Sequence, residues 1–362
     1  MNGRNDATGG KPAEGGAARP TLDDVAKEAN VSQKTASRVL NNEKYVRPEV
    51  RHRVEEAILR LGYRSNDLAR TLKLGATRTI GLVVTDISNP FYAACALGVA
   101  RVARRRGYTV LLSSSDEGLP AEREYVELLV RQRIAGLIVV PAAGDHSYLA
   151  SEQARGLPIV ALDRPLVGLE TDCILSENEA GARAMTAHLL EHGRRRIALL
   201  CGSPDIYTYA MRLQGYRRAM EAAGAPEIIR FITPTVEGAA EATVKLMSEP
   251  VRPDSICCVN NRVTVGVLGA LGRLGITVPD DLAVIGFDDF ELGDVVRPRL
   301  SVVRQPAIEI GMQAATLLIG RIEGLESGPP RAVTLPVEVA IRDSCGPHEL
   351  VEQSKDPGVP AM

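Results

Sequence analysis

The sequence predicts an α/β protein in which a small N-terminal helix-turn-helix head precedes a large core of two doubly wound parallel sheets. Residues 21–41 read as two short helices separated by a tight turn. From Thr79 onward, short β-rich runs alternate with helical stretches, which is typical of parallel sheets covered by helices. Charge also divides along the chain: residues 1–78 carry a balance of +5 and residues 79–362 a balance of −7, within a net charge of −2. The two short helices at residues 21–41 therefore lie in the basic part of the chain, which favours a nucleic-acid partner for them.

The first helix is predicted to begin after Thr21, whose hydroxyl can accept a backbone N–H of the first turn. Asp24, three residues later, can return a hydrogen bond to the backbone of Thr21 and complete a capping box. Val25 and Ala29 belong to its one apolar edge. Asn30 can take the left-handed conformation that ends the helix.

The second helix is predicted to present a polar face, because Ser32 can cap it and Ala36, Val39 and Leu40 form its inward side. Its outward side chains are of the types that bond base edges and phosphates, and such a helix normally enters the major groove by its N-terminal end. The motif alone leaves a pair of ordinary bundle helices as the alternative. The polar residues are Gln33, Lys34, Thr35, Ser37 and Arg38.

A third helix is expected from Pro48 to about Leu61, ended by Gly62. Residues 64–78 could form a further short helix capped by Asn66, with Leu68, Ala69 and Leu72 on one side. Such a helix would need a partner, because isolated helices shorter than about 12 to 15 residues are marginal in water.

The core contains too many β-rich runs for one compact sheet. The helix-Gly-strand passages ARRRGYTVLLSSS and EHGRRRIALLCGS suggest two similar halves, and we therefore expect two lobes with a cleft between them. The expected strands are TIGLVV, TVLLSSS, GLIVVP, PIVALD, RIALLCG, IRFITP, SICCVN and LAVIGFD.

Charged, amide and aromatic groups follow these strands, and ligands of open α/β sheets bind outside the carboxyl ends of strands. Converging donors and acceptors suit a small polyhydroxylated ligand, and an aromatic face can stack on a sugar ring or a base. Each residue taken alone has another explanation, because Asp and Asn are common in caps and turns. The groups are the segment from Thr85 to Tyr92, then Asp163 and Arg164, Tyr207 to Arg212, Asn260 and Asn261, and Asp288 and Asp289.

Other functional classes lack their signatures in the sequence. The longest apolar runs, such as IGLVV and GLIVVP, are far too short to span a membrane, and the Gly/Ala-rich N-terminus lacks a secretion signal, so we expect a cytoplasmic protein. No dinucleotide, P-loop, HExxH or GxSxG motif is present, and GVLGALGRLG at 266–275 has the wrong spacing. The six cysteines lack metal-ligand spacing and are expected to be reduced, and His188 and His192 are expected at the surface. Neither a metal nor a cofactor is expected.

Seven segments, in this order, carry a resemblance to one family: TLDDVAKEANVSQKTASRVLNN, VRPEVRHRVEEAILRLGYRSNDLARTLKLGATRTIGLVV, DISNPFY, LDRP, RLQGYRRAM, VPDDLAVIGFDD and VVRQP. The sequence resembles the lactose-repressor family of bacterial transcription regulators over about residues 20–345. The resemblance implies a helix-turn-helix head, a DNA-induced hinge helix and a core like that of periplasmic sugar-binding proteins. It also implies dimers that bind palindromic operators.

Carried over by matching motifs, Gln33, Lys34 and Arg38 would read bases, and Leu72 would be a minor-groove wedge. The full set expected to contact DNA is Thr21, Ser32, Gln33, Lys34, Thr35, Ser37, Arg38, Asn41, Tyr45, Asn66, Ala69, Leu72 and Lys73. The set expected to line an effector cleft is Asn89, Phe91, Tyr92, Asp163, Arg164, Thr208, Arg212, Asn260, Asp288 and Gln305. Departures from the family pattern at Ser176-Glu177, Asn261 and Ile206-Tyr207 leave the identity of the ligand open, with a purine as the chief alternative to a sugar.

The expected domains are a disordered tail at 1–19, the head at 20–63, a hinge at 64–78, the core at 79–345 and a flexible tail at 346–362. Within the core, one lobe is expected at about 79–175 and 304–328 and the other at about 176–303 and 329–345. The function inferred is a homodimeric, sequence-specific DNA-binding regulator, a repressor whose affinity for double-stranded operator DNA is set by a carbohydrate-like effector. A soluble α/β enzyme acting on sugars or nucleosides is the alternative, and a turnover assay would distinguish the two.

Overall fold

The computed structural model describes residues 20–40, 43, 45–63 and 77–346, which fall into two compact units divided after Thr77. The first unit is the helical head. Its helices are α1 (Leu22–Glu28), α2 (Gln33–Leu40) and α3 (Pro48–Leu61). They enclose a small apolar core that includes Val25, Ala36 and Val54.

The ends of the head helices follow the local signals in the sequence. Thr21 and Asp24 form the reciprocal capping box at the start of α1. Asn30 has φ 49°, and Gly62 ends α3 with φ 60°, so both left-handed positions are occupied by residues that tolerate them. Arg47, before Pro48, makes no side-chain cap, and the fixed φ of the proline supports the start of α3 instead.

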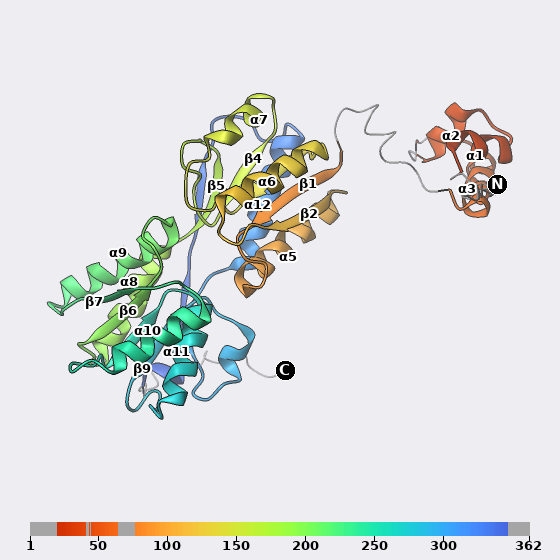
Figure 1. Ribbon diagram of the computed structural model, residues 1–362. Helices are drawn as coiled ribbons and strands as arrows, with labels where there is room; N and C mark the ends of the chain where they lie inside the picture. The colour runs from red at the N-terminus through yellow and green to blue at the C-terminus, as the bar shows by residue number, and fades with distance from the viewer. Residues whose placement is uncertain (1–19, 41–42, 44, 64–76, 347–362) are drawn as a thin grey trace, which may run out of the picture. The chain divides into compact units, whose positions relative to one another are not determined.

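The second unit is an α/β core with two sheets of six strands each, and Figure 1 shows each sheet with its own covering helices. The first sheet has the order β11-β5-β4-β3-β1-β2. Its strands are β1 (Thr79–Val84), β2 (Thr109–Ser114), β3 (Gly136–Val139), β4 (Ile159–Leu162), β5 (Asp172–Ser176) and β11 (Ala332–Leu335). Its helices are α5 (Pro90–Arg105), α6 (Leu119–Arg131), α7 (Ala150–Ala154) and α12 (Ala307–Ile322), with a 3₁₀ turn at Ser147–Leu149.

The second sheet has the order β12-β10-β9-β8-β6-β7. Its strands are β6 (Ile197–Cys201), β7 (Ile228–Phe231), β8 (Ser255–Cys258), β9 (Ala283–Phe287), β10 (Ser301–Arg304) and β12 (Glu338–Ala340). Its helices are α8 (Asn178–Glu191), α9 (Tyr207–Ala222), α10 (Val236–Met247) and α11 (Asn261–Arg273), with 3₁₀ turns at Glu291–Asp294 and Asp343–Cys345. The strand pairs are parallel except β10 with β12, so the predicted doubly wound architecture is confirmed.

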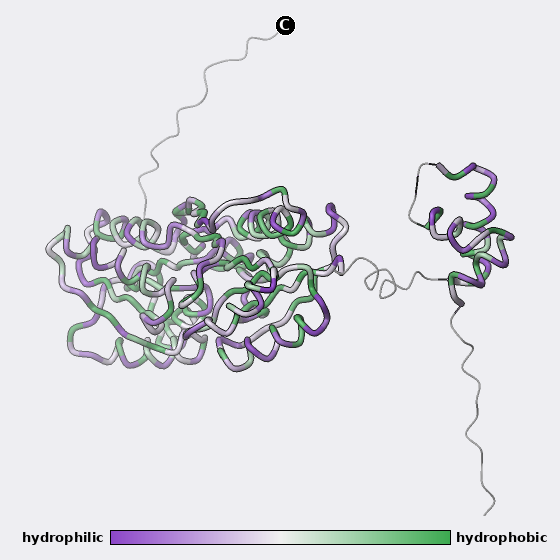
Figure 2. The backbone as a smooth tube through the Cα atoms, turned by 90° about the horizontal axis from the view of Figure 1, so that it is seen from above, coloured by the Kyte–Doolittle hydropathy of each residue, from purple (hydrophilic) through white to green (hydrophobic). Residues whose placement is uncertain are grey.

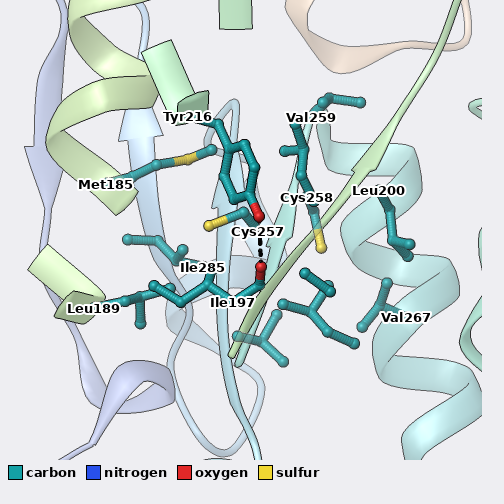
Figure 3. Close-up of a cluster of buried hydrophobic side chains, with 14 of the residues drawn as sticks. Met185, Leu189, Ile197, Leu200, Tyr216, Cys257, Cys258, Val259, Val267 and Ile285 are labelled. Carbon is teal, nitrogen blue, oxygen red and sulfur yellow. Dashed lines mark hydrogen bonds between the residues drawn. The ribbon is translucent and has the colours of Figure 1, made fainter. Parts of the chain in front are cut away.

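The cores lie between the sheets and their helices. Strands such as β3, β6 and β8 are buried along their whole length, as expected for parallel strands covered on both faces. Hydrophobic and hydrophilic stretches alternate along the chain throughout the core (Figure 2). In the second lobe the Tyr216 hydroxyl donates a 2.7 Å hydrogen bond to the Ile197 carbonyl inside an otherwise apolar cluster (Figure 3). This bond satisfies the polar end of a fully buried aromatic side chain.

The expected boundary between the lobes near residue 329 is wrong. β11 pairs with β5, so residues 332–335 belong to the first lobe and the chain returns to the second lobe only before β12. The two segments are short edge strands, and nothing in their hydrophobic pattern distinguishes the two sheets. Strands β5, β10, β11 and β12 are additions to the eight expected from β-rich runs.

Candidate functional site

The second helix of the head presents the polar face that the sequence predicts. Gln33, Lys34 and Arg38 are exposed, whereas Thr35 and Ser37 are half-buried and Ala36 and Val39 are buried. Ser32 is exposed, and its hydroxyl accepts the backbone N–H of Thr35 at 3.2 Å, so it caps α2 as expected.

Other residues predicted to contact DNA lie at the edges of the head or beyond the described residues. Tyr45 is 99% exposed, and Thr21 is exposed at the start of α1. Nε of Arg38 lies 3.5 Å from the Glu43 carboxylate, and both side chains of this ion pair are exposed. Asn41, Asn66, Ala69, Leu72 and Lys73 lie outside the described residues, as do the predicted tail at 1–19, the predicted tail at 346–362 except Gly346, and most of the hinge.

A cavity of about 610 Å³ lies in the core, lined by residues of both lobes. It is bordered by segments that follow strands β1, β2, β4, β6, β7, β8 and β9, which is where the strand-end argument places a ligand. Nine of the ten predicted effector residues line it: Asn89, Phe91, Tyr92, Asp163, Arg164, Thr208, Arg212, Asn260 and Asp288. The tenth, Gln305, stands behind the lining and donates a 2.5 Å hydrogen bond to the Asp288 carboxylate.

The wall from the first lobe is a chain of linked polar groups. The Tyr92 hydroxyl donates to Asp163 at 3.2 Å and accepts a 2.9 Å hydrogen bond from Arg164. Arg164 in turn donates two hydrogen bonds of 2.9 Å to the carboxylate of Glu117, in the loop after β2. The Phe91 ring packs edge-on against Tyr92, with the ring centroids 5.1 Å apart. The aromatic and charged groups predicted here therefore form one continuous surface.

The wall from the second lobe is organised by Arg212. Its guanidinium donates to the Asn178 side chain at 2.8 Å and to the Val259 carbonyl at 2.5 Å, and it lies 3.9 Å from the Asp288 carboxylate. The guanidinium carbon lies 3.7 Å from the centroid of the Phe287 ring, which adds a cation–π contact.

Asn260 completes this wall. Its side-chain oxygen caps α11 by accepting the Val263 N–H at 2.8 Å. Its amide nitrogen donates to the Tyr209 hydroxyl at 3.2 Å, which leaves its orientation fixed. Asn260 is therefore both a helix cap and a group on the cavity surface.

Burial dominates the electrostatics of Asp163 and Asp288, the two fully buried carboxylates of the cavity. Burial raises the pKa of Asp163, opposed by Arg164 and Arg212. Burial likewise raises the pKa of Asp288, opposed by Arg212 and by the hydrogen bond from Gln305. Burial works to lower the pKa of Arg164, but Tyr92, Glu117 and Asp163 outweigh it and raise that pKa well above its usual value. Arg164 is therefore a permanent cation in this wall.

Side chains of the two lobes also bond each other directly at the cavity. Asn261 donates to the Asn89 side chain at 3.0 Å. Arg262 donates to the Asp86 carboxylate at 2.9 Å and to the Ser88 hydroxyl at 2.8 Å. Asp86 and Ser88 lie in the flagged segment from Thr85 to Tyr92 but not in the predicted effector set, and Arg262 was not predicted at all.

Glu117 and Tyr209 are further cavity residues that the sequence prediction missed. The strand-end rule could have found Glu117, because it follows the expected strand TVLLSSS by two residues. Tyr209 lies inside the flagged segment from Tyr207 to Arg212.

A second hollow, of about 820 Å³, lies between α8 and α9 and is bordered by Ser176, Glu177 and Tyr207. Despite its larger volume, that hollow is an open surface groove, so we take the inter-lobe cavity as the candidate site.

Among the residues that the structure describes, no group of three or more His, Cys, Asp and Glu side chains could hold a metal ion. All six cysteines are free and buried. Of the two histidines expected at the surface, His192 is exposed, but His188 is half-buried beside the Cys345 sulfur. None of the described helices is both long and apolar enough to cross a membrane.

The geometry defines a class of protein: a helix-turn-helix head joined to a core with a polar cavity between two α/β lobes. Comparison with known proteins gives the family. Residues 21–66 match the family model of bacterial regulatory proteins, lacI family, and residues 186–345 match a periplasmic binding protein-like domain.

Relatives cover almost the whole chain. The ribose operon repressor of Halalkalibacterium halodurans is 35% identical over 90% of this chain and 96% of the relative. The HTH-type transcriptional repressor PurR of Aliivibrio fischeri strain MJ11 is 33% identical over 90% of this chain and 98% of the relative. A crystal structure of the lac repressor dimer bound to operator and an anti-inducer superposes with a TM-score of 0.82 at 26% identity, covering 91% of this chain and 99% of that chain.

The chain therefore belongs to the lacI family. It is a DNA-binding transcriptional regulator, and the relatives support this interpretation over the enzyme alternative.

Proposed function

We propose that this regulator is a homodimeric repressor that acts in the cytoplasm on a palindromic operator and whose DNA affinity is set by a sugar bound between the lobes. The observation that carries the proposal is the convergence of the predicted effector residues on one cavity. Carboxylates, guanidinium groups and an amide there offer both acceptors and donors to adjacent hydroxyls, and Phe91 and Tyr92 supply an aromatic edge.

Unsatisfied polar atoms support a ligand in this place. Within the residues that the structure describes, Oδ1 of Asp163 and Nε of Arg164 are buried without a hydrogen-bond partner. Buried polar atoms are normally paired, so a ligand that offers hydroxyls to this wall would satisfy both an acceptor and a donor.

Exposed apolar residues support the dimer. Leu97 on α5, Leu111 and Leu112 on the edge strand β2, and Val265 on α11 are each more than a third exposed. An edge strand with apolar side chains is a surface that proteins normally cover. A second copy of the chain would also present a second recognition helix, as a palindromic operator requires.

Coupling between ligand binding and DNA binding requires that the ligand bind the DNA-competent and DNA-incompetent arrangements of the core with different affinities. Coupling free energies of about 1 to 3 kcal/mol are typical, which correspond to a change in operator affinity of about 5- to 150-fold.

The test combines operator selection with a ligand panel. Genomic fragments captured by the full chain would supply the operator, and calorimetry with pentoses, hexoses and purine bases would identify the ligand class. Asp288→Asn should lower ligand affinity by about 1.5 to 3 kcal/mol while leaving ligand-free operator affinity unchanged. Asp280→Asn, at an exposed position away from the cavity, is the matched control. Binding of a purine base and of no sugar would reject the sugar, and unimpaired binding by Asp288→Asn would reject the site.

A further inference from the structure

Glu117 holds Arg164 from a loop that connects β2 to α6. Both carboxylate oxygens accept a hydrogen bond of 2.9 Å from the two terminal nitrogens of Arg164. This two-point geometry is the one in which arginine binds a carboxylate or phosphate ligand most strongly. Glu117 therefore already occupies the face of Arg164 that an anionic ligand would use.

The loop that carries Glu117 is conformationally unusual. Asp116 and Glu117 have φ values of 51° and 57°, so two successive non-glycine residues are left-handed. This conformation is unfavourable for such residues and persists where surrounding contacts determine it. Ser115 and Gly118 anchor the loop, since the Ser115 N–H donates to the Val84 carbonyl and the Gly118 N–H to the Ser115 carbonyl, both at 2.9 Å. The backbone thus directs Glu117 toward the cavity.

The other two arginines of the cavity also lie near carboxylates, although without the two-point contact of Arg164. Each of the three arginines that line the cavity has a carboxylate within 4 Å: Arg164 has Glu117, Arg212 has Asp288 and Arg262 has Asp86. The lining also contains Asp163 and Asp116, so its five acidic side chains outnumber its three arginines. An entering anion would therefore meet no arginine that lacks a nearby carboxylate.

We propose that Glu117 is a specificity-determining residue that neutralises Arg164 and thereby restricts the cavity to uncharged polyhydroxylated ligands, excluding their phosphorylated and carboxylated counterparts. This inference rests on the proposed ligand site between the lobes. With Glu117 in this role, the first lobe discriminates between ligands by their charge as well as by the pattern of their hydroxyl groups.

The reverse role for Glu117 gives a different outcome. If Glu117 merely stood in for an anionic ligand and swung away when that ligand arrived, the wild-type protein would itself bind phosphate or a sugar phosphate. The two roles are thus separated by the behaviour of the unmodified chain toward anions.

Inorganic phosphate is the first probe, because it needs no knowledge of the natural ligand. Thermal unfolding of the full chain would be followed in phosphate and in chloride at equal ionic strength. We expect phosphate to raise the unfolding midpoint of Glu117→Gln by more than it raises that of the wild type. Glu117→Asp keeps the charge and should resemble the wild type, as should Glu124→Gln on the exposed face of α6. Phosphate bound by the basic head would contribute equally to all four proteins.

Ribose with ribose 5-phosphate and glucose with glucose 6-phosphate form the second probe. In calorimetry, Glu117→Gln should shift the ratio of affinities toward the phosphorylated member of a pair by about tenfold or more. Phosphate stabilisation of the wild type equal to that of Glu117→Gln, or no stabilisation of Glu117→Gln, would overturn the proposal. If the phosphate result holds and no neutral sugar binds the wild type, the sugar assignment fails while the role of Glu117 stands.

Discussion

Arg262 of α11 and Asp86 after β1 join the two lobes across the cavity, with a hydrogen bond of 2.9 Å between guanidinium and carboxylate. The two residues are separated by 176 positions in the chain. The same guanidinium also donates to Ser88. Because the pair lies on the cavity lining, any change in the angle between the lobes must alter it. The contact therefore ties the cavity lining to the arrangement of the two lobes.

We predict that Arg262→Ala lowers ligand affinity by about two- to fivefold, because the variant loses an interaction that stabilises the joined lobes. The effect is modest because both side chains are partly exposed, and such pairs are worth about 0.2 to 1 kcal/mol. Calorimetry of the wild type, Arg262→Ala, Asp86→Asn and the double variant would measure the coupling. Arg273→Ala, exposed at the end of the same helix, is the control. Strictly additive effects of Arg262→Ala and Asp86→Asn would show that the pair contributes nothing.

A second prediction concerns the recognition helix. Arg38→Ala should weaken operator binding by about 1 to 3 kcal/mol and relax preference at one base pair, since a base contact specifies sequence. Lys34→Ala, if Lys34 contacts phosphate, should weaken all sequences alike and reduce the dependence on salt. Fluorescence anisotropy with the selected operator and single-base variants would separate the two patterns. The same affinity and preference in Arg38→Ala as in the wild type would remove Arg38 from the base-reading set.

Local signals explain which parts of the fold the sequence predicted. The signals that begin and end the head helices act within a few residues, so the sequence alone could predict them. They are the capping box of Thr21 and Asp24, the left-handed Asn30 and the terminating Gly62. The polar strand ends were equally legible, because the carboxyl ends of parallel strands converge in any doubly wound sheet.

Non-local geometry explains what the sequence did not show. The pairing of Arg262 with Asp86 depends on how two lobes face each other, and no spacing along the chain encodes it. β11 and β12 are edge strands of four and three residues, so their assignment to different sheets depends on chain crossings between the lobes. Glu117 shows an intermediate case: its position at a strand end was visible, but its bond to Arg164 was not.

The close packing of α5 against α12 gives a third prediction. A Cβ atom on Gly311 would collide with the backbone carbonyl of Cys95, and one on Gly98 would collide with that of Ile308. Gly311→Ala should therefore force the helices apart and destabilise the first lobe by about 1 to 3 kcal/mol. Urea unfolding followed by circular dichroism would report a lower midpoint.

Gly272→Ala is the matched control for Gly311→Ala, because it also lies in a helix but a Cβ there meets no atom within 4 Å. It should be neutral or stabilising by up to about 1 kcal/mol, as alanine favours the helix over glycine. Equal midpoints for the two variants would contradict the packing argument.

The raised pKa values of Asp163 and Asp288 give a prediction for pH. A buried carboxyl with a raised pKa favours the protonated form in the folded, ligand-free core. The contribution of such a carboxyl to stability is thus present below its ordinary pKa of 3.8 and is lost as the pH rises through the raised pKa.

Ligand binding should depend on pH for the same reason. Ligand hydroxyls donate to the charged carboxylate and lower its pKa again, so binding should release protons. We expect ligand affinity to rise with pH above 3.8 and to level off once both carboxyls are ionised without ligand. Calorimetry in two buffers of different ionisation enthalpy would count the protons, and Asp288→Asn should release fewer of them. Binding that exchanges no protons in the wild type across this range would show that neither carboxylate accepts a hydrogen bond from the ligand.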